Sequence, residues 1–224
     1  MRNRYCHETR LSERKFLQIL KCFTVDIVSL KAAELCAVNK NTTHRFYGLL
    51  RRRVLELSLE ENQPFSGEVE IDESYFGARR VKGKRGRGAA GKIPVVGLLK
   101  RDGKVYVQIV ENCSREQLMP VIKGQVLENT TIYTDGWKAY ASLITEGYKH
   151  YRIFHEENEF ARGKNHVNGI ESFWSYANLR MAQKKGIRKD AFVAHLLESQ
   201  WRWNQRHSHP FLILKNNLLH SPLN

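Results

Sequence analysis

The spacing of the hydrophobic residues changes once along this 224-residue chain, near residue 66. Before that point, apolar residues recur at the three- and four-residue intervals of amphipathic helices. After it, apolar and polar residues alternate in several short runs, as they do in half-buried strands. The change predicts a small all-α domain over residues 1–57, a polar linker over 58–66 and an α/β domain over 67–224.

The predicted all-α domain has the outline of a helix-turn-helix unit. An apolar stripe over residues 11–23 is followed by a short helix over 30–36 and, after a tight turn, by a third helix that ends near residue 53. Residues 41–43 can cap that third helix. Side chains at its two ends are expected to reach the bases and phosphates of DNA: Asn41, Thr42, Thr43, Arg45, Arg51, Arg52 and Arg53. An ordinary three-helix bundle with solvated polar ends is the alternative.

The charge of the chain favours a nucleic acid as its partner. Lys and Arg number 37 against 23 Asp and Glu, which leaves a formal net charge of +14. Apolar residues make up 42% of the chain, which is enough for a core, but no apolar run approaches the ~20 residues of a membrane span. The charged N-terminus also lacks the apolar segment of a secretion signal. A basic protein inside the cell most often meets DNA or RNA, and a merely basic surface is the alternative.

The pattern beyond residue 66 predicts a mixed sheet with helices. Residues 68–75 alternate polar and apolar side chains, and the runs 94–100 and 104–110 flank an Arg-Asp-Gly turn that indicates a hairpin. The remaining elements are predicted in the order helix, strand, short helix, strand and two helices, over residues 115–126, 130–134, 137–146, 148–154, 168–183 and 190–204.

Carboxylates are concentrated where these strands and helices begin or end. Glu68, Glu70 and Asp72 share one face of the first strand, because side chains alternate along a strand. Three like charges on one face repel each other, so that face is either solvated or binds a cation. Asp135 ends a later strand, and Glu171 lies in the first turns of a helix. Since the histidines and cysteines show no zinc-site spacing, a metal here would have carboxylate ligands.

Four stretches of the α/β segment resemble a known family. The stretches are residues 67–77, 85–92, 133–137 and 166–174. Asp72 precedes Asp135 by 63 residues, and Asp135 precedes Glu171 by 36. These spacings and strings resemble the DDE transposases, in particular the 1016 subgroup of the insertion-sequence 1595 family. The likeness extends from about residue 10 to beyond residue 205.

The resemblance implies a ribonuclease H-like catalytic domain preceded by a helix-turn-helix domain, in the transposase of a bacterial mobile element. Asp72, Asp135 and Glu171 would be its catalytic residues and would hold two Mg²⁺ (or Mn²⁺) ions. Double-stranded DNA would be cut at terminal inverted repeats and joined to target DNA, by at least a dimer. Such a protein is expected in the cytoplasm, associated with the nucleoid. Two alternatives stay open: a nuclease with the same core but no strand transfer, and a DNA-binding regulator without catalysis.

A basic, glycine-rich segment follows the first strand and is expected to clamp DNA beside the site. Its cations are Arg79, Arg80, Lys82, Lys84, Arg85, Arg87 and Lys92. The alternative is a solvated hairpin tip without a binding role.

Five residues are expected to support the catalytic triad: Glu70, His166, Asn168, Trp174 and Asn178. His166 and Asn168 precede Glu171 and would contact DNA or metal-bound water, although a helix-capping role for Asn168 is an equal alternative. Trp174 would pack beside the site and steady its helix. Members of the resembled subgroup usually carry Lys at the position of Asn178, and an Asn there can only hydrogen-bond to a phosphate.

Overall fold

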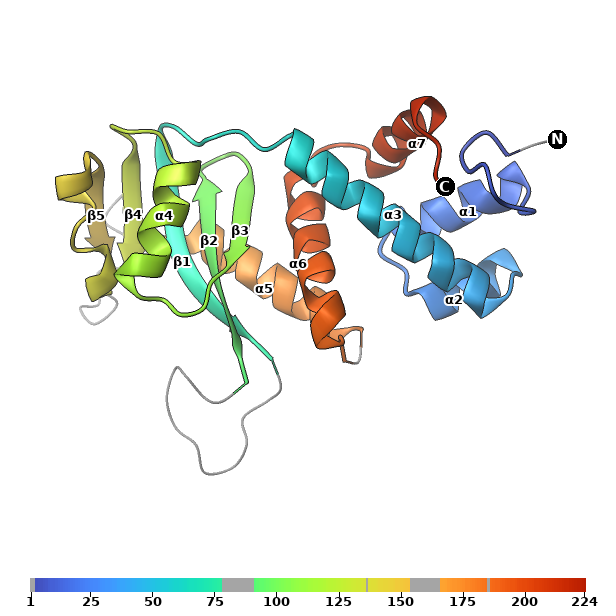
Figure 1. The fold of residues 1–224 in the computed structure, drawn as a ribbon, viewed down its shortest axis with the longest axis horizontal. Helices are drawn as coiled ribbons and strands as arrows, with labels where there is room; N and C mark the ends of the chain where they lie inside the picture. The colour runs from blue at the N-terminus through green and yellow to red at the C-terminus, as the bar shows by residue number, and fades with distance from the viewer. Residues whose placement is uncertain (1–2, 78–90, 136, 154–165, 185) are drawn as a thin grey trace. The chain divides into compact units, whose positions relative to one another are not determined.

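The computed structural model describes residues 3–77, 91–135, 137–153, 166–184 and 186–224 (Figure 1). They form two compact units, each with its own core. The helical unit combines Met1–Glu61 with Gly186–Asn224, and the sheet unit comprises Asn62–Lys185. The expected single domain over residues 67–224 is therefore divided, because its last 39 residues pack with the N-terminal helices.

Five helices build the helical unit. They are α1 (Glu13–Thr24), α2 (Ser29–Cys36), α3 (Lys40–Glu60), α6 (Lys189–Asn204) and α7 (Pro210–His220). The boundary differs from the expected one because α6 and α7 share a hydrophobic core with the N-terminal helices. In this core, Trp201, Leu214 and Leu218 are buried in one cluster with Phe16 and Phe46. Helix α7 was not predicted from the sequence. None of the described helices is long and apolar enough to cross a bilayer.

Helices α2 and α3 pack together across a three-residue turn, as the helix-turn-helix prediction requires. Ala37 makes the turn in the left-handed region, with φ of 47°. The cap of α3 is Asn39, whose side chain accepts a hydrogen bond from the Asn41 amide, rather than residues 41–43. The helix also continues to Glu60, so the first residues of the expected linker are helical.

The sheet unit contains the predicted mixed sheet. Its strands are β1 (Glu68–Phe76), β2 (Ile93–Lys100), β3 (Val105–Ile109), β4 (Thr131–Asp135) and β5 (Lys149–Ile153). They lie in the order β3-β2-β1-β4-β5. The pairs β1–β2 and β2–β3 are antiparallel, whereas β1–β4 and β4–β5 are parallel. This is the ribonuclease H-like sheet that the sequence resemblance implies, and the predicted hairpin is β2–β3.

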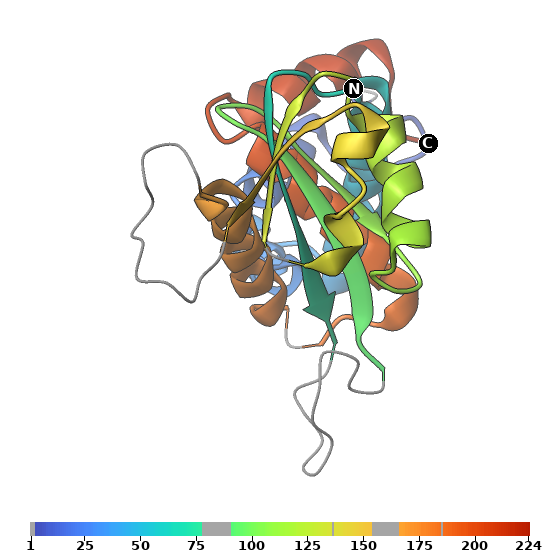
Figure 2. The same cartoon turned by 90° about the vertical axis from the view of Figure 1, so that its left-hand side faces the viewer.

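Helices cover the two faces of the sheet differently. Helix α4 (Arg115–Gln125) packs on the face formed by Val69, Ile71 and Leu98, in the main apolar core of this unit. Helix α5 (Asn168–Ala182) packs on the opposite face, over β1 and β2, and Figure 2 shows the two helices on either side of the sheet. We call these the α4 face and the α5 face. Two short 3₁₀ helices, η1 (Lys138–Tyr140) and η2 (Ile144–Glu146), replace the single helix predicted after β4.

Helix α5 lies very close to the sheet at Gly97. A Cβ atom at this position would lie 2.5 Å from Trp174 Cζ2 and 2.9 Å from Ile170 Cδ1. No side chain fits there, so the glycine lets α5 contact the backbone of β2. Gly97 pairs with Asp72 across the β1–β2 ladder, which brings the helix down directly beside Asp72.

Acidification is expected to weaken the sheet unit through His150. Its Nε2 lies 2.9 Å from Thr134 Oγ1, and the Thr134 hydroxyl donates to the Asp135 carbonyl at 2.7 Å. Nε2 therefore carries the proton in the neutral ring. Nδ1 is buried without a hydrogen-bond partner among the described residues, so protonating it costs free energy. Burial, and secondarily the charge of Arg152, lower the pKa of His150 to about 4.

The unfolded chain binds this proton near pH 6.5 and the folded chain only near pH 4. At this group the unfolded state therefore holds more protons below pH 6.5, and the contribution of His150 to the free energy of unfolding should fall by up to about 2 kcal/mol as the pH drops to 4. Urea unfolding at several pH values measures this loss. The loss should be smaller in His150→Gln, whose side chain does not titrate, and equal losses in both proteins would contradict the assignment.

Candidate active site

Two of the three candidate carboxylates extend from neighbouring strands. In the parallel β1–β4 pair, Ile71 lies beside Thr134, so the next step along both strands places Asp72 beside Asp135. Because side chains alternate, both carboxylates project from the α5 face. Glu171 lies in the first turn of α5, on the same side of the sheet, and is exposed. The fold therefore places all three acids on the α5 side of the sheet, two on strands and one on a helix.

The surroundings of Asp72 disfavour the ionised form of its carboxyl group. Burial, with smaller contributions from the charges of Asp135 and Glu171, raises its pKa to about 6, against the lowering effect of the Glu73 backbone amide. Asp135 and Glu171 thus both lie within electrostatic range of Asp72. Among the described residues, however, no three His, Cys, Asp or Glu side chains converge closely enough to enclose an ion. The sheet register gives Asp72 and Asp135 their common location, and mutual repulsion keeps like charges apart when no cation is bound.

Two tryptophans border these acids. Asp135 Oδ1 accepts a hydrogen bond from the Trp137 amide at 3.0 Å, and the Trp137 indole donates to the Cys113 carbonyl at 3.3 Å. Trp174 is buried against Phe76, with ring centroids 5.9 Å apart. Its indole is near enough to Asp72 to lower the pKa of that carboxyl slightly, although no hydrogen bond with standard geometry forms. Trp174 therefore holds α5 against the sheet beside Asp72.

Arg101 neutralises the other two carboxylates on this face of β1, Glu68 and Glu70. Its Nε donates to Glu70 Oε1 at 2.9 Å, and its Nη1 lies 3.5 Å from Glu68 Oε2. The guanidinium also stacks on the ring of Tyr133, 3.8 Å from the centroid. The guanidinium of Arg101, and not a metal ion, thus supplies the positive charge that offsets the repulsion between Glu68 and Glu70.

Sequence reasoning missed Arg101, which it assigned only to a hairpin turn. The useful signal was register: Lys100 pairs with Val69, so the next residue of the hairpin reaches Glu68, whose carbonyl accepts from the Arg101 amide at 3.0 Å. That pairing becomes visible only when the hairpin is placed beside β1.

The supporting residues lie along α5 and the segment before it. The His166 carbonyl accepts a hydrogen bond from Arg101 Nη2 at 2.6 Å. Asn168 begins the helix, but no side chain from the helix or from its N-cap residue caps this end, so the capping alternative for Asn168 is not realised. Asn178 is exposed two turns beyond Glu171. Arg180 is 3% exposed and cannot replace a surface cation there.

Comparisons with known proteins identify the family of this chain. A family model described as an ISXO2-like transposase domain matches residues 64–204, which include all three candidate carboxylates. The chain belongs to this transposase family. The family is that of the insertion-sequence 1595 transposases, as the motifs imply.

Two curated relatives carry related descriptions. An uncharacterized transposase-like protein of Haemophilus influenzae is 36% identical over 101 residues, which cover 45% of this chain and 81% of the relative. An uncharacterized protein in transposable element ISH50 of Halobacterium salinarum is 30% identical over 176 residues, which cover 70% of this chain and 60% of the relative. This transposase thus spans less than two thirds of the length of the second relative.

A solved structure, the HTLV-2 integrase catalytic core domain in complex with magnesium in its dimeric form, aligns with 72% of this transposase and 100% of its own length. The two share 15% sequence identity at a TM-score of 0.39.

The structure alters the expected DNA-binding set of the transposase. Thr43 is fully buried, and its hydroxyl donates to the Lys40 carbonyl, so it does not face solvent. Arg51 pairs with Glu198 at 2.7 Å, and Arg53 donates to Glu56 and Asn217. Both guanidiniums are engaged within the helical unit and not presented to a groove. Of the expected DNA contacts on α3, Asn41, Arg45 and Arg52 are exposed and Thr42 is half-buried. Because the helix continues to Glu60, Arg52 lies in its middle and not at its end.

The basic segment after β1 is only partly described. Lys92 is exposed at the start of the hairpin. The expected clamp residues Arg79, Arg80, Lys82, Lys84, Arg85 and Arg87 lie outside the described residues.

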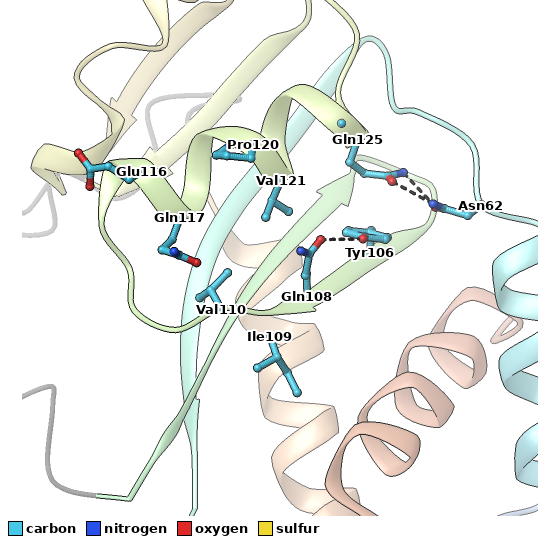
Figure 3. Close-up of a pocket in the computed structure, with 11 residues that line it drawn as sticks. Asn62, Tyr106, Gln108, Ile109, Val110, Glu116, Gln117, Pro120, Val121 and Gln125 are labelled. Atoms are coloured by element: carbon cyan, nitrogen blue, oxygen red, sulfur yellow. Dashed lines mark hydrogen bonds between the residues drawn. The ribbon is translucent and has the colours of Figure 1, made fainter.

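A cavity of about 440 Å³ lies between β3 and α4, away from the candidate carboxylates (Figure 3). Neutral side chains such as Gln108, Gln117 and Gln125 line much of it, and Asn62 exchanges hydrogen bonds with Gln125. None of Asp72, Asp135 and Glu171 contributes to its wall. This cavity is therefore not the candidate active site.

Proposed function

We propose that this transposase binds the terminal inverted repeats of a mobile element, cuts the DNA there and joins the cut ends to target DNA. The observation that carries the proposal is the common location of Asp72, Asp135 and Glu171 on the α5 face, within electrostatic range, in a chain of a transposase family. Glu171 is exposed beside the interior strands β1 and β4. An open site of this kind suits a long polymeric substrate better than an enclosed cavity does.

The donor set of this site fits two divalent cations. Carboxylate oxygens are the ligands that Mg²⁺ and Mn²⁺ prefer. Burial raises the pKa of Asp72 most, and the charges of Asp135 and Glu171 add a smaller repulsion that cations would relieve. Asp72, Asp135 and Glu171 would hold the ions. When bound, the ions would activate the attacking oxygen and stabilise the leaving oxygen at the scissile phosphate.

The reaction would have two phosphoryl transfers at this one site. In the first, a water oxygen attacks the phosphorus at the element end, the bond from phosphorus to the 3′ oxygen breaks, and that oxygen leaves as a 3′-hydroxyl. In the second, this hydroxyl loses its proton and its oxygen attacks a target phosphorus, which releases a 3′-hydroxyl of the target strand. Neither transfer needs an oxidant or a reductant.

The chain's own residues would position the reactants. In the helical unit, Asn41, Arg45 and Arg52 of the helix-turn-helix would contact DNA, and Thr42 and Lys92 would add contacts. In the sheet unit, the Trp137 amide holds Asp135, and Trp174 fixes α5 beside Asp72. Since two element ends must be cut and joined together, the acting form would be a homodimer or a larger assembly on double-stranded DNA.

A joint cleavage and joining assay tests the proposal. The purified chain is incubated with Mg²⁺, labelled DNA carrying the inverted repeats that flank its gene, and a supercoiled plasmid. Cut repeats and plasmid molecules that carry the label are expected, and both should vanish with EDTA or with scrambled repeats. Cut repeats without joined plasmid would replace the proposal by a nuclease. Binding of the repeats without cutting would replace it by a regulator.

A further inference from the structure

The first turn of α5 is tied to β1 through a buried carboxylate. Glu70 is 1% exposed, and its Oε2 accepts a hydrogen bond from the Ile170 amide at 2.9 Å. The first amides of a helix have no partner within the helix, so this bond satisfies one of them and places a negative charge at the positive end of the helix. No side chain from the helix itself performs this task.

We propose that Glu70 and Arg101 form a positioning clamp that sets the distance between Asp72 on β1 and Glu171 on α5. Glu70 lies two residues before Asp72 on the same face of the same strand. The amide that it binds belongs to Ile170, the residue directly before Glu171. A shift of this contact therefore moves one candidate metal ligand relative to the other. The inference rests on the proposed function, because it takes Asp72 and Glu171 as ligands of the same site.

Arg101 provides the second attachment of the clamp. Its Nε donates to Glu70, and its Nη2 donates to the His166 carbonyl at 2.6 Å. A single guanidinium thus neutralises the buried carboxylate and holds the chain just before the helix. The stacking of Arg101 on Tyr133 of β4 fixes its plane and connects the clamp to the strand that ends in Asp135. Both attachments are made by residues that sequence reasoning did not place in contact.

Gly169 is the feature that allows so close a contact. A Cβ atom at this position would lie 2.8 Å from Glu70 Oε2 and 3.1 Å from Leu99 Cδ2. Gly169 lies within α5 and shows no left-handed φ, so its backbone conformation suits alanine. The glycine is therefore explained by space for the Glu70 carboxylate and not by backbone geometry.

The variant Gly169→Ala tests the clamp without changing any charge. The added methyl group meets the end of a long side chain, the Glu70 carboxylate, and not backbone, so the fold should survive while rotation about the side-chain bonds moves the carboxylate off the helix end. The affinity for Mn²⁺ alone, measured by calorimetry on the full chain, is expected to fall roughly 10- to 100-fold, as for other residues that orient metal ligands. Exchange of the Ile170 amide should accelerate, and kcat for cleavage should fall with little change in KM for DNA.

Gly124→Ala is the matched control in the same unit. Gly124 lies in α4, and a Cβ atom there would meet nothing within 4 Å. Because alanine favours a helix, this variant should melt at a slightly higher temperature with unchanged Mn²⁺ affinity. If Gly169→Ala also retains its Mn²⁺ affinity and its Ile170 protection within about twofold, less than any known positioning effect, the clamp is refuted.

A double-mutant cycle then assigns the effect to Glu70. In a Glu70→Ala background, Gly169→Ala should change Mn²⁺ affinity by less than about twofold, because the carboxylate it displaces is gone. Glu70→Gln, which keeps a carbonyl oxygen for the Ile170 amide, should retain more affinity than Glu70→Ala. An equal effect of Gly169→Ala in both backgrounds would overturn the role of Glu70.

Glu171→Gln separates this inference from the proposed function. If Glu171→Gln leaves Mn²⁺ affinity and cleavage intact, the proposed site is wrong, whereas exchange of the Ile170 amide still reports whether Glu70 holds the helix. If Glu171→Gln loses both Mn²⁺ affinity and cleavage but Gly169→Ala retains both, the proposed site is supported and the clamp is refuted.

Discussion

Asp72→Asn is expected to abolish DNA cleavage and, at the same time, to make the metal-free chain more stable. Loss of one candidate metal ligand removes several kcal/mol of transition-state stabilisation, so the cleavage rate should fall by about 10³-fold or more. The stability gain has a separate cause. Burial raises the pKa of Asp72 to about 6, with further contributions from the charges of Asp135 and Glu171, so the folded protein at neutral pH bears an unfavourable carboxylate.

The neutral amide of asparagine removes both the cost of burying a charge at this position and the smaller repulsion by Asp135 and Glu171. We expect the free energy of unfolding at pH 7.5, without metal, to rise by about 1–3 kcal/mol, measured by urea unfolding. A residue kept for packing alone would show the opposite, since its replacement would weaken the fold. A variant that loses cleavage activity while its free energy of unfolding rises therefore identifies Asp72 as a functional carboxylate.

Asp102→Asn is the matched control for this substitution. Asp102 is exposed in the β2–β3 turn with φ of 55°, a conformation that asparagine also adopts readily. Neither cleavage nor stability should change in that variant. Full cleavage by Asp72→Asn would show that the active site lies elsewhere, and a large loss of stability would show that Asp72 has a structural partner.

Glu198→Ala is expected to cause the largest loss of stability in the helical unit. Glu198 is 1% exposed on α6, and its two oxygens accept from Arg51 of α3 at 2.7 Å and from Arg202 at 2.9 Å. Arg202 also donates to the Phe23 and Thr24 carbonyls at the end of α1. The network thus joins three helices that are distant in the sequence.

Removing the carboxylate takes one hydrogen-bond acceptor from each of two largely buried guanidiniums, those of Arg51 and Arg202. The cost of breaking such a buried pair is about 3–5 kcal/mol, which is a large share of the stability of a small domain. Chemical unfolding followed by circular dichroism measures it, and binding of the inverted repeats should weaken as the helical unit loosens.

Glu34→Ala provides the exposed counterpart in the same unit. Glu34 pairs with Lys31 at 2.8 Å, but its side chain is 60% exposed, so its loss should cost less than about 0.5 kcal/mol. Comparable costs for Glu34→Ala and Glu198→Ala would mean that burial does not determine the strength of these pairs, contrary to the prediction.

The periodicity of the sequence predicted most elements of the sheet unit because it is a local property. The alternation over β1 and the Arg-Asp-Gly turn between β2 and β3 depend only on neighbouring residues. The same alternation correctly separated Glu68, Glu70 and Asp72 from Glu73, which accepts a hydrogen bond from Tyr140 on the α4 face. Helix α7 was missed since its mixed apolar pattern has no strong amphipathic face.

The domain boundary could not be read from the sequence. Helix α6 follows α5 directly in the chain, and nothing local indicates that Trp201 packs with Phe16 of α1. The triple arginine at residues 51–53 has the composition of a DNA contact, yet two of its members pair with Glu198 and Asn217, more than a hundred residues away. The sequence shows that an arginine can bind an anion, but it does not show whether a phosphate of DNA or a carboxylate of the same chain lies nearest to it.

What the sequence determined by itself is the family, the order of the elements and the three acids at their spacing, because these depend on residue identity and local repetition. Only the tertiary structure decided how the carboxylates of β1 are divided. The pairing of the hairpin with β1 brings Arg101 to Glu68 and Glu70, which leaves Asp72 with Asp135 and Glu171. A carboxylate becomes a structural anchor or a candidate metal ligand according to the charge that the fold places beside it.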